Sequence, residues 1–129
     1  MQKVLIVDDE PTPRAFLEHA LRAAHFEVLQ SSSGEEALSL IHSKRPDIVL
    51  LDIRLPGIDG VEVLRRLRQA HGTRALPVIF LTGSILEVDE LVSALELDPS
   101  DFLTKAVSAR ELVARVKWVL RRPSVGEKD

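Results

Sequence analysis

The chain has 129 residues, of which 45% are hydrophobic and 29% are charged, so it has the length of one domain and is too apolar for a disordered segment. Its net charge of −3 gives no general basic surface for nucleic acid, and the absence of cysteine excludes disulfides and zinc-thiolate sites. We find no signal peptide and no apolar run near the ~20 residues of a membrane span, so we expect a cytoplasmic domain that binds neither membrane nor nucleic acid.

Short apolar segments alternate with helical segments along the chain. The apolar runs that predict strands span residues 3–7, 26–30, 47–52, 77–82 and 101–105. The patterns that predict helices, with apolar residues every three or four positions, span residues 13–25, 33–44, 59–69, 87–97 and 108–122. Because each helix returns the chain to the same end of the sheet, the alternation predicts an α/β fold with a five-stranded parallel sheet covered by helices on both faces.

The starts and inner faces of the helices are also predicted. Three helices begin with the spacing of a capping box: Ser33 with Glu36, Asp59 with Glu62, and Ser108 with Glu111. Thr12 is the predicted N-cap of the first helix, with Pro13 at its first helical position. The side chains that we expect to face the core are Phe16, Leu17, Ala20, Leu21 and Ala24 in the first helix, Val88, Leu91, Val92 and Leu95 in the fourth, and Leu112, Val113, Val116, Val119 and Leu120 in the last.

Polar side chains follow four of the predicted strands at the point where each ends: Asp8 and Asp9, then Asp52, Thr82 and Lys105. The carboxyl ends of parallel strands meet at one edge of the sheet, where ligands bind. Three carboxylates without histidine or cysteine favour Mg²⁺, which in turn favours a phosphate group that Lys105 and Thr82 can bind. Asp52 stands alone at the end of the most apolar strand, so we assign it as a phosphoacceptor that forms an aspartyl phosphate.

Four stretches, "LIVDDEP", "IVLLDIRLPGIDG", "VIFLTG" and "DFLTK", occur in an order and spacing that resemble the receiver domain of bacterial two-component response regulators. The resemblance covers residues 3–122, so we expect a receiver domain at 1–122 and a tail or linker start at 123–129. It implies the flavodoxin-like strand order 2-1-3-4-5. It also implies a regulatory domain that is not an enzyme but assists its own phosphorylation and dephosphorylation.

The resemblance also implies roles for individual residues. It implies that Mg²⁺ is held by the carboxylates of Asp8 (through water), Asp9 and Asp52 and by the backbone carbonyl of Arg54. The phosphoryl group would come from a phosphohistidine of a sensor histidine kinase or phosphotransfer protein. Thr82 and Phe102 would form the switch, in which the hydroxyl moves toward the phosphoryl group and the ring rotates inward.

The last helix resembles those of the winged-helix transcription-regulator subgroup, whose members dimerise through the last strand and helices. Asp101 and Arg115 would then be candidates for ion pairs between subunits, with Trp118 and Arg122 at the same surface. Trp118 is predicted to lie opposite the buried side of its helix. An exposed tryptophan beside arginines is typical of an interface anchor, and a single exposed aromatic is also common on monomers, so both interpretations remain open.

Three departures from the family pattern matter. Ala106 stands where the family has a proline joined by a cis bond, so the peptide bond from Lys105 is either strained cis or trans with a different loop. The segment 82–89 contains one residue more than expected. Asp98 replaces a glycine before the last strand, and aspartate adopts the left-handed conformation better than most residues.

Alternatives to a phosphorylation-switched receiver remain open. A degenerate receiver would act as a protein-interaction module without phosphorylation. A haloacid-dehalogenase-type phosphatase would need a second aspartate two residues after the first, whereas Arg54 follows Asp52 at that spacing. A flavodoxin-like flavin site would need a Ser/Thr-rich loop after the first strand, where the sequence is "DDEPTPR".

Overall fold

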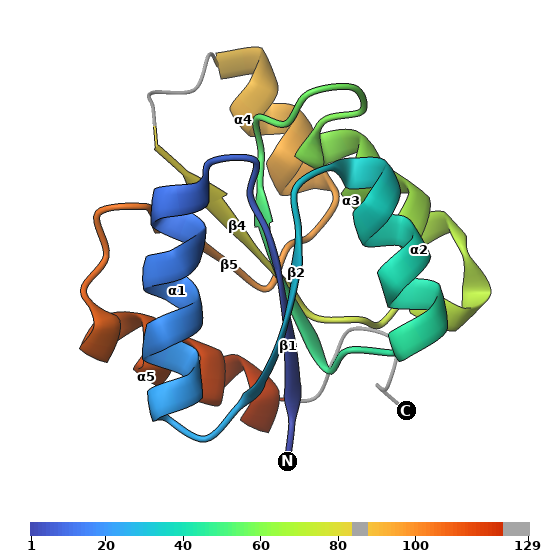
Figure 1. The fold of residues 1–129 in the computed structure, drawn as a ribbon. Coiled ribbons are helices and arrows are strands. Elements are labelled where there is room, and N and C mark those ends of the chain that lie inside the picture. Colours follow the sequence, from blue (N-terminus) through green and yellow to red (C-terminus); the bar gives the residue numbers. More distant parts are fainter. Residues whose placement is uncertain (84–87, 123–129) are drawn as a thin grey trace.

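The computed structural model describes residues 1–83 and 88–122. The strands are β1 (Lys3–Val7), β2 (Glu27–Ser31), β3 (Ile48–Asp52), β4 (Val78–Thr82) and β5 (Asp101–Thr104). The helices are α1 (Pro11–Ala23), α2 (Gly34–Lys44), α3 (Gly60–Gln69), α4 (Val88–Glu96) and α5 (Ala109–Arg121), as Figure 1 shows, with a 3-10 turn at His71–Thr73. None of the helices in the described segments has the length and apolar run that a membrane crossing requires.

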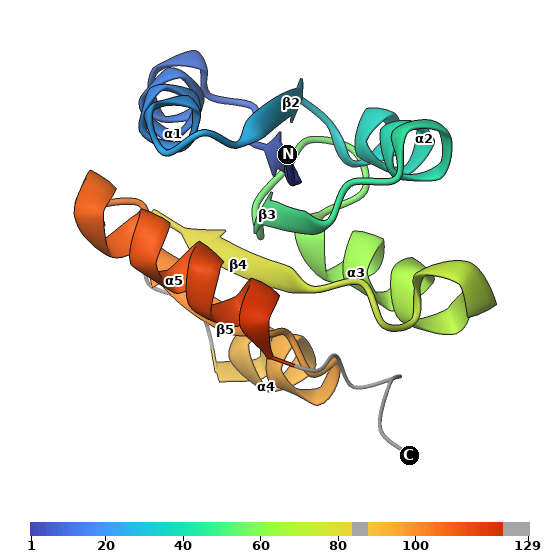
Figure 2. The same ribbon diagram turned by 90° about the horizontal axis from the view of Figure 1, so that it is seen from below.

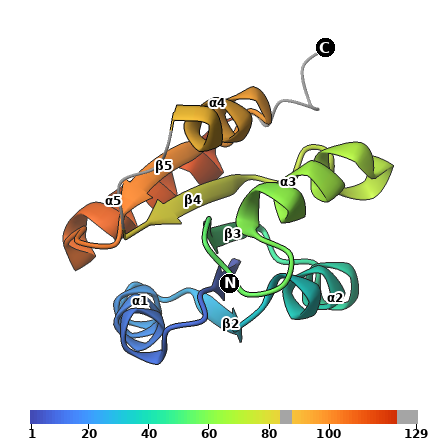
Figure 3. The same cartoon turned by 90° about the horizontal axis from the view of Figure 1, so that it is seen from above.

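The five strands form one parallel sheet in the order β2-β1-β3-β4-β5, which confirms the predicted fold class and strand order. Helices α1 and α5 cover one face, and α2, α3 and α4 cover the other (Figure 2). Central strand β3 is buried along its whole length, because both of its faces lie under helices. The carboxyl ends of the strands lie along one edge of the sheet, which Figure 3 shows from above.

The sheet separates two apolar cores. The core under α1 and α5 contains Val4, Ile6, Leu17, Leu21, Ile48, Leu50, Ile79, Leu81, Leu112 and Val116, among others. The core under α2, α3 and α4 contains Leu5, Val7, Ala37, Ile41, Val49, Leu51, Leu64, Leu67, Phe80 and Ala94, among others. Alternate residues of each strand therefore go to opposite cores, so the strand backbones are fixed from both sides.

The predicted start of the first helix is wrong by two residues. Helix α1 begins at Pro11, and its N-cap is Glu10, whose side chain makes no capping hydrogen bond. Proline suits this first position because the N–H that it lacks would have no partner inside the helix. The backbone N–H of Glu10 donates instead to Asp8 Oδ1 at 2.9 Å, so the turn into the helix forms directly after the strand. Thr12 is thus helical and not a cap.

Two of the predicted inner faces are partly wrong. Phe16 is 44% exposed, because at 3.6 residues per turn it lies roughly 90° from the centre of the buried side of α1. In α4 the exposed side chains include Leu91, Val92 and Leu95, whereas the small side chain of Ala94 is fully buried. Helix α4 therefore contacts the core through Ala94 and turns its apolar stripe toward solvent. The side chain of Val88 lies outside the described residues.

The three capping-box N-caps are confirmed. The side chains of Ser33, Asp59 and Ser108 accept the backbone N–H groups of Glu36, Glu62 and Glu111, at 3.1, 2.9 and 3.1 Å respectively. Each such cap contributes about 1 kcal/mol to helix stability. Asp98, in place of the family's glycine, has φ of +56°, so it adopts the left-handed conformation expected of it.

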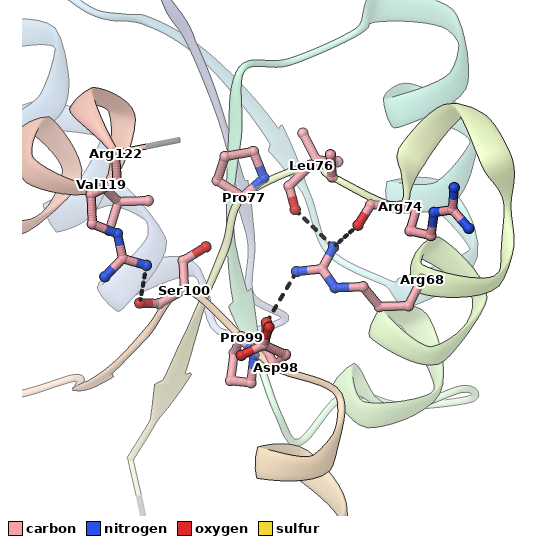
Figure 4. Close-up of a pocket in the computed structure, with 10 residues that line it drawn as sticks. Arg68, Arg74, Leu76, Pro77, Asp98, Pro99, Ser100, Val119 and Arg122 are labelled. Atoms are coloured by element: carbon pink, nitrogen blue, oxygen red, sulfur yellow. Dashed lines mark hydrogen bonds between the residues drawn. The ribbon is translucent and has the colours of Figure 1, made fainter. Parts of the chain in front are cut away.

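Arg68 links the loops before β4 and β5 at the edge of the sheet opposite the carboxyl ends. The Arg68 guanidinium donates to the carbonyls of Leu76 at 2.8 Å and Arg74 at 3.3 Å, before β4. It also donates to the carbonyls of Leu97 at 3.3 Å and Asp98 at 3.4 Å, before β5, and Figure 4 shows this side chain between the two loops. Burial lowers the pKa of Arg68 from its ordinary value, with partial compensation by Asp98. These bonds fix where β4 and β5 start.

Candidate functional site

Four strands deliver the predicted site residues to one pocket. The register pairs Asp52 with Leu81 and Thr82 with Thr104, so the ends of β3, β4 and β5 are level. The pocket at this edge is lined by Asp9, Glu10, Asp52, Arg54, Thr82, Gly83 and Lys105. Asp8 lies beside it and is fully buried. The sequence-predicted carboxylates, hydroxyl and ammonium thus lie at one edge of the sheet.

The ammonium of Lys105 contacts three carboxylates at once. Its Nζ lies 2.8 Å from Asp52 Oδ2, 2.8 Å from Glu10 Oε1 and 3.0 Å from Asp8 Oδ2. Asp8 and Asp52 are buried and Glu10 is exposed. Three negative charges face one positive charge, so the cluster has an excess of two negative charges when all four groups are ionised. Such an excess of negative charge beside buried carboxylates favours the binding of a further cation.

The cluster fits a divalent ion. One carboxylate oxygen each of Asp8, Glu10 and Asp52 lies within 4.8 Å of the others. Asp8 Oδ2 is buried and accepts no hydrogen bond from the described residues, although the Lys105 ammonium forms an ion pair with it at 3.0 Å. A buried carboxylate oxygen that accepts no hydrogen bond suits coordination of a hard cation such as Mg²⁺.

Glu10 is the acid that sequence reasoning missed. The predicted metal set named Asp8, Asp9 and Asp52, but the side chain of Asp9 is exposed and lines the pocket without joining the cluster. Glu10 lies with Asp8 and Asp52 instead and binds Lys105 directly. The available signal was the third consecutive acid in "DDE", which we did not include in the site.

The pKa shifts follow from burial and from the shared ammonium. Burial raises the pKa of Asp52 above its ordinary value, and the hydrogen bond from Lys105 opposes this only in part. Burial alone would lower the pKa of Lys105, but its hydrogen bonds to Asp52, Glu10 and Asp8 outweigh burial and raise that pKa. The hydrogen bond from Lys105 lowers the pKa of Glu10. The structure therefore keeps Lys105 charged and makes the ionised form of Asp52 costly.

The loop after β3 packs tightly against Asp52. The backbone N–H of Arg54 donates to Asp52 Oδ1 at 3.2 Å, so both oxygens of this carboxylate have donors. A Cβ at Gly60 would lie 2.3 Å from the backbone oxygen of Asp52, so only glycine allows α3 to start so close to β3. Gly57 has φ of +73° and supplies the turn between them.

The loop after β1 is held by an arginine that sequence reasoning also missed. The guanidinium of Arg14 donates to the backbone carbonyl of Asp8 at 2.7 Å and to Gln30 Oε1 at 3.2 Å. The backbone N–H of Asp8 in turn donates to the carbonyl of Ser31 at 3.1 Å. Both peptide groups around Asp8 are thereby satisfied, which fixes its carboxylate in the buried position.

Lys105 keeps its place without the family's proline. Every peptide bond in residues 1–83 and 88–122 is trans, including Lys105–Ala106. The N–H of Lys105 donates to the carbonyl of Thr82 at 2.9 Å, which holds the residue in register beside β4. A Cβ at Gly83 would lie 3.3 Å from Lys105 Cδ, so glycine leaves room for the lysine stem. The additional residue expected in 82–89 concerns a segment whose residues 84–87 lie outside the described part of the chain.

The two predicted switch residues lie on neighbouring strands. Thr82 is half-buried at the end of β4 and lines the pocket. Phe102 is half-buried on β5, and its ring centroid lies 5.4 Å from that of the buried Phe80. The Phe102 ring therefore packs on the core in this conformation. The roles of Thr82 and Phe102 stay predictions.

The predicted interface residues gather on β5 and α5. The buried side of α5 is largely as predicted, with Leu112, Val116 and Val119 buried and Val113 and Leu120 partly buried. Trp118 is 47% exposed, and the guanidinium of Arg122 lies 4.3 Å from its ring centroid. Within one chain Arg115 pairs with Asp101 at 3.0 Å, which accounts for the raised pKa of Arg115.

Comparisons with known proteins agree with this architecture. The model of the response regulator receiver domain matches residues 4–117. The chain is 41% identical over 126 residues to the phosphate regulon transcriptional regulatory protein PhoB of Pseudomonas aeruginosa; the match covers 98% of this chain and 55% of PhoB. The chain thus spans about half the length of that relative.

Solved structures show the same fold. A putative response regulator from Chloroflexus aurantiacus is 40% identical, with a TM-score of 0.86 over 94% of this chain and 98% of that one. The BeF3-activated N-terminal receiver domain of Klebsiella pneumoniae RstA is 33% identical, with a TM-score of 0.81 over 94% of this chain and all (100%) of that one. On the strength of the matched family model, the relatives and the fold, this chain belongs to the response regulator receiver domain family.

Proposed function

We propose that the protein is a phosphorylation-switched signalling domain in which Asp52 accepts a phosphoryl group from a phosphohistidine of a sensor histidine kinase or phosphotransfer protein. The observation that carries the proposal is the contact of a buried Asp52 carboxylate with the Lys105 ammonium, 2.8 Å away, beside two further acids. Membership of the receiver family agrees with it.

The reaction is a displacement at phosphorus. An oxygen of Asp52 forms a bond to phosphorus while the bond from phosphorus to the histidine nitrogen breaks. The phosphohistidine enters protonated on its other ring nitrogen, so histidine leaves as neutral imidazole. Lys105 would neutralise charge on the transferring group, and Thr82 would donate a hydrogen bond to it. The same groups would assist hydrolysis of the acyl phosphate, so the domain would act on itself only.

Mg²⁺ would be held by Asp8, Asp9 and Asp52 with the backbone carbonyl of Arg54, and Glu10 lies close enough to the cluster to take part. When bound, it would supply charge neutralisation for the incoming phosphoryl oxygens. The buried, unsatisfied oxygen of Asp8 supports this ligand set. Asp8 and Asp9 serve as ligands and Asp52 as ligand and nucleophile.

The proposed output is a change of binding surface. Movement of Thr82 toward the phosphoryl group would free space for Phe102 to turn inward, which changes the surface made by α4, β5 and α5. A second copy of the chain would dock there, with Asp101 and Arg115 exchanging partners across the interface and with Trp118 and Arg122 beside them. The exposed Leu91 and Leu95 on α4 add apolar area to that surface.

The proposed domain limits are 1–122 for the receiver and 123–129 for a tail or linker. PhoB is a transcriptional regulatory protein, and the chain spans about half its length, so we propose that the domain works in the cytoplasm beside an output domain. We propose that the receiver itself binds neither nucleic acid nor membrane.

The test is phosphorylation by acetyl phosphate with Mg²⁺, followed by intact-mass measurement. We expect one added phosphoryl group on the wild type and none on Asp52→Asn, whereas Asp89→Asn, on the exposed side of α4, serves as a matched control that is still modified. An unmodified wild type would contradict the proposal and favour the degenerate receiver that acts without phosphorylation.

A further inference from the structure

Glu10 places a negative charge at the opening of the Asp52 pocket. Its side chain is 62% exposed, whereas the side chains of Asp8 and Asp52 are 0% and 5% exposed. An anion that approaches from solvent therefore meets the Glu10 carboxylate before it reaches the buried acids. Asp9 also lines the pocket, but as a proposed Mg²⁺ ligand its charge would be matched by the ion.

The Glu10 side chain is directed at the pocket and not at its own helix. Glu10 is the N-cap of α1, a position whose side chain commonly accepts an N–H of the first turn, but its side chain makes no such bond. Its carboxylate accepts a hydrogen bond from Lys105 Nζ at 2.8 Å instead. One of its oxygens lies within 4.8 Å of carboxylate oxygens of Asp8 and Asp52. A group that reacts at Asp52 is therefore close enough to Glu10 to interact with its charge.

The charge of Glu10 is present at neutral pH, since the hydrogen bond from Lys105 lowers the pKa of this carboxyl. The exposed ion pair itself contributes little to stability. Its charge nevertheless acts on every ion that enters the pocket. At a separation of about 5–8 Å in water, one unit charge changes the affinity for a singly charged ion about 2–4-fold, and for a doubly charged ion about 5–15-fold.

Phosphodonors differ in the charge that they bring to the pocket. Acetyl phosphate is mainly a dianion at neutral pH. Phosphoramidate is mainly protonated on the nitrogen that is bonded to phosphorus, so it carries a single net negative charge. A phosphohistidine protonated on its other ring nitrogen carries the same net charge. A fixed carboxylate at the opening of the pocket therefore disfavours the acyl phosphate more than either N-phosphoryl donor.

We propose that Glu10 determines the phosphodonor specificity of the pocket: its charge favours N-phosphoryl donors such as phosphohistidine over small dianionic acyl phosphates, and it strengthens the binding of a divalent cation. This inference rests on the proposed function and adds to it a residue that selects among phosphodonors. In each transfer an oxygen of Asp52 bonds to phosphorus; acetyl phosphate loses its P–O bond and releases acetate, and phosphoramidate loses its P–N bond and releases ammonia. Acetyl phosphate still reacts, but more slowly than it would without Glu10.

The test compares the rate constants of adduct formation with the two donors, measured by intact mass at low ionic strength and at Mg²⁺ concentrations that saturate each variant. Glu10→Gln keeps an oxygen to which Lys105 can donate but removes the charge. It should raise the rate constant about 5–15-fold with acetyl phosphate and about 2–4-fold with phosphoramidate. Glu10→Asp keeps the charge and should keep the wild-type ratio of the two rate constants. Glu96→Gln, at the exposed end of α4, is the matched control and should change neither, and high salt should reduce the differences.

Mg²⁺ binding should change in the opposite direction. In calorimetry without a phosphodonor, Glu10→Gln should bind Mg²⁺ about 5–15-fold more weakly than the wild type, whereas Glu96→Gln should bind it equally well. If Glu10→Gln changes both donor rates by the same factor, or leaves Mg²⁺ affinity unaltered, the inference is overturned while the proposed function stands. If neither donor modifies the wild type, both fall together.

Discussion

Removal of the Lys105 ammonium should destabilise the metal-free protein. In Lys105→Met the stem is largely kept, but Asp8 and Asp52, both buried, lose their cation at 3.0 and 2.8 Å. Breaking a buried ion pair costs ~3–5 kcal/mol. Protonation of Asp52, whose pKa is already raised by burial, relieves part of this. We therefore expect a loss of about 2–4 kcal/mol in the free energy of unfolding.

The assay is thermal and urea unfolding without divalent ions. For a domain of this size the loss corresponds to a fall of roughly 10 °C in Tm. Lys117→Met, on the exposed side of α5, is the matched control and should stay within about 0.5 kcal/mol of the wild type. Added Mg²⁺ should raise the Tm of Lys105→Met more than that of the wild type, because the ion meets no competing ammonium. Equal stability of the two lysine variants would show that the Lys105 ammonium does not stabilise the buried carboxylates.

Three further predictions concern the same site. Asp52→Asn should stabilise the metal-free protein by about 1–2 kcal/mol in urea unfolding, because its pKa is raised by burial and asparagine resembles the favoured protonated form. This gain in the free energy of unfolding should be present above the pKa that Asp52 has in the folded wild type, and it should vanish as the pH falls below that pKa. A gain that does not change with pH would contradict this cause. Asp8→Asn should weaken Mg²⁺ binding at least about tenfold in calorimetry, whereas Asp89→Asn should not. Gly60→Ala should lose at least about 1–3 kcal/mol in thermal unfolding, because a Cβ at residue 60 would lie 2.3 Å from the Asp52 carbonyl oxygen, whereas Gly72→Ala, whose Cβ would meet nothing nearer than 3.9 Å, should be neutral.

The strand ends were predictable because parallel topology fixes them. Alternating strands and helices predict a parallel sheet, in which the carboxyl ends of all strands lie at the same edge. That edge must therefore hold Asp52, Thr82 and Lys105, whatever the number of residues between them. The structure agrees, and the trans bond at Ala106 does not displace Lys105 from the cluster. The prediction that helices cover both faces of the sheet is confirmed as well, since each face packs on its own apolar core.

The predictions that were wrong concern which side of a helix faces the core. The face of α4 cannot be read from apolar spacing, because Leu91, Val92 and Leu95 form a regular stripe that the fold leaves exposed while Ala94 packs inward. Glu10 joins Asp8 and Asp52 because of how the chain turns into α1, and the Asp8 carboxylate sets that turn by accepting the Glu10 N–H. The role of Asp9 as a metal ligand stays a prediction. The exposed face of α4 has no local sequence signal, whereas the third consecutive acid in "DDE" was a signal for Glu10.

We propose that Asp52 becomes an acyl phosphate in a pocket shared with Lys105. The most direct measurement is borohydride reduction of the protein after treatment with acetyl phosphate and Mg²⁺, followed by peptide mass mapping, since reduction converts an aspartyl phosphate to homoserine. We expect homoserine at position 52 alone, and none when Mg²⁺ is removed. Homoserine at Asp8 or Asp9, or an unreduced protein that carries no phosphoryl group, would contradict it.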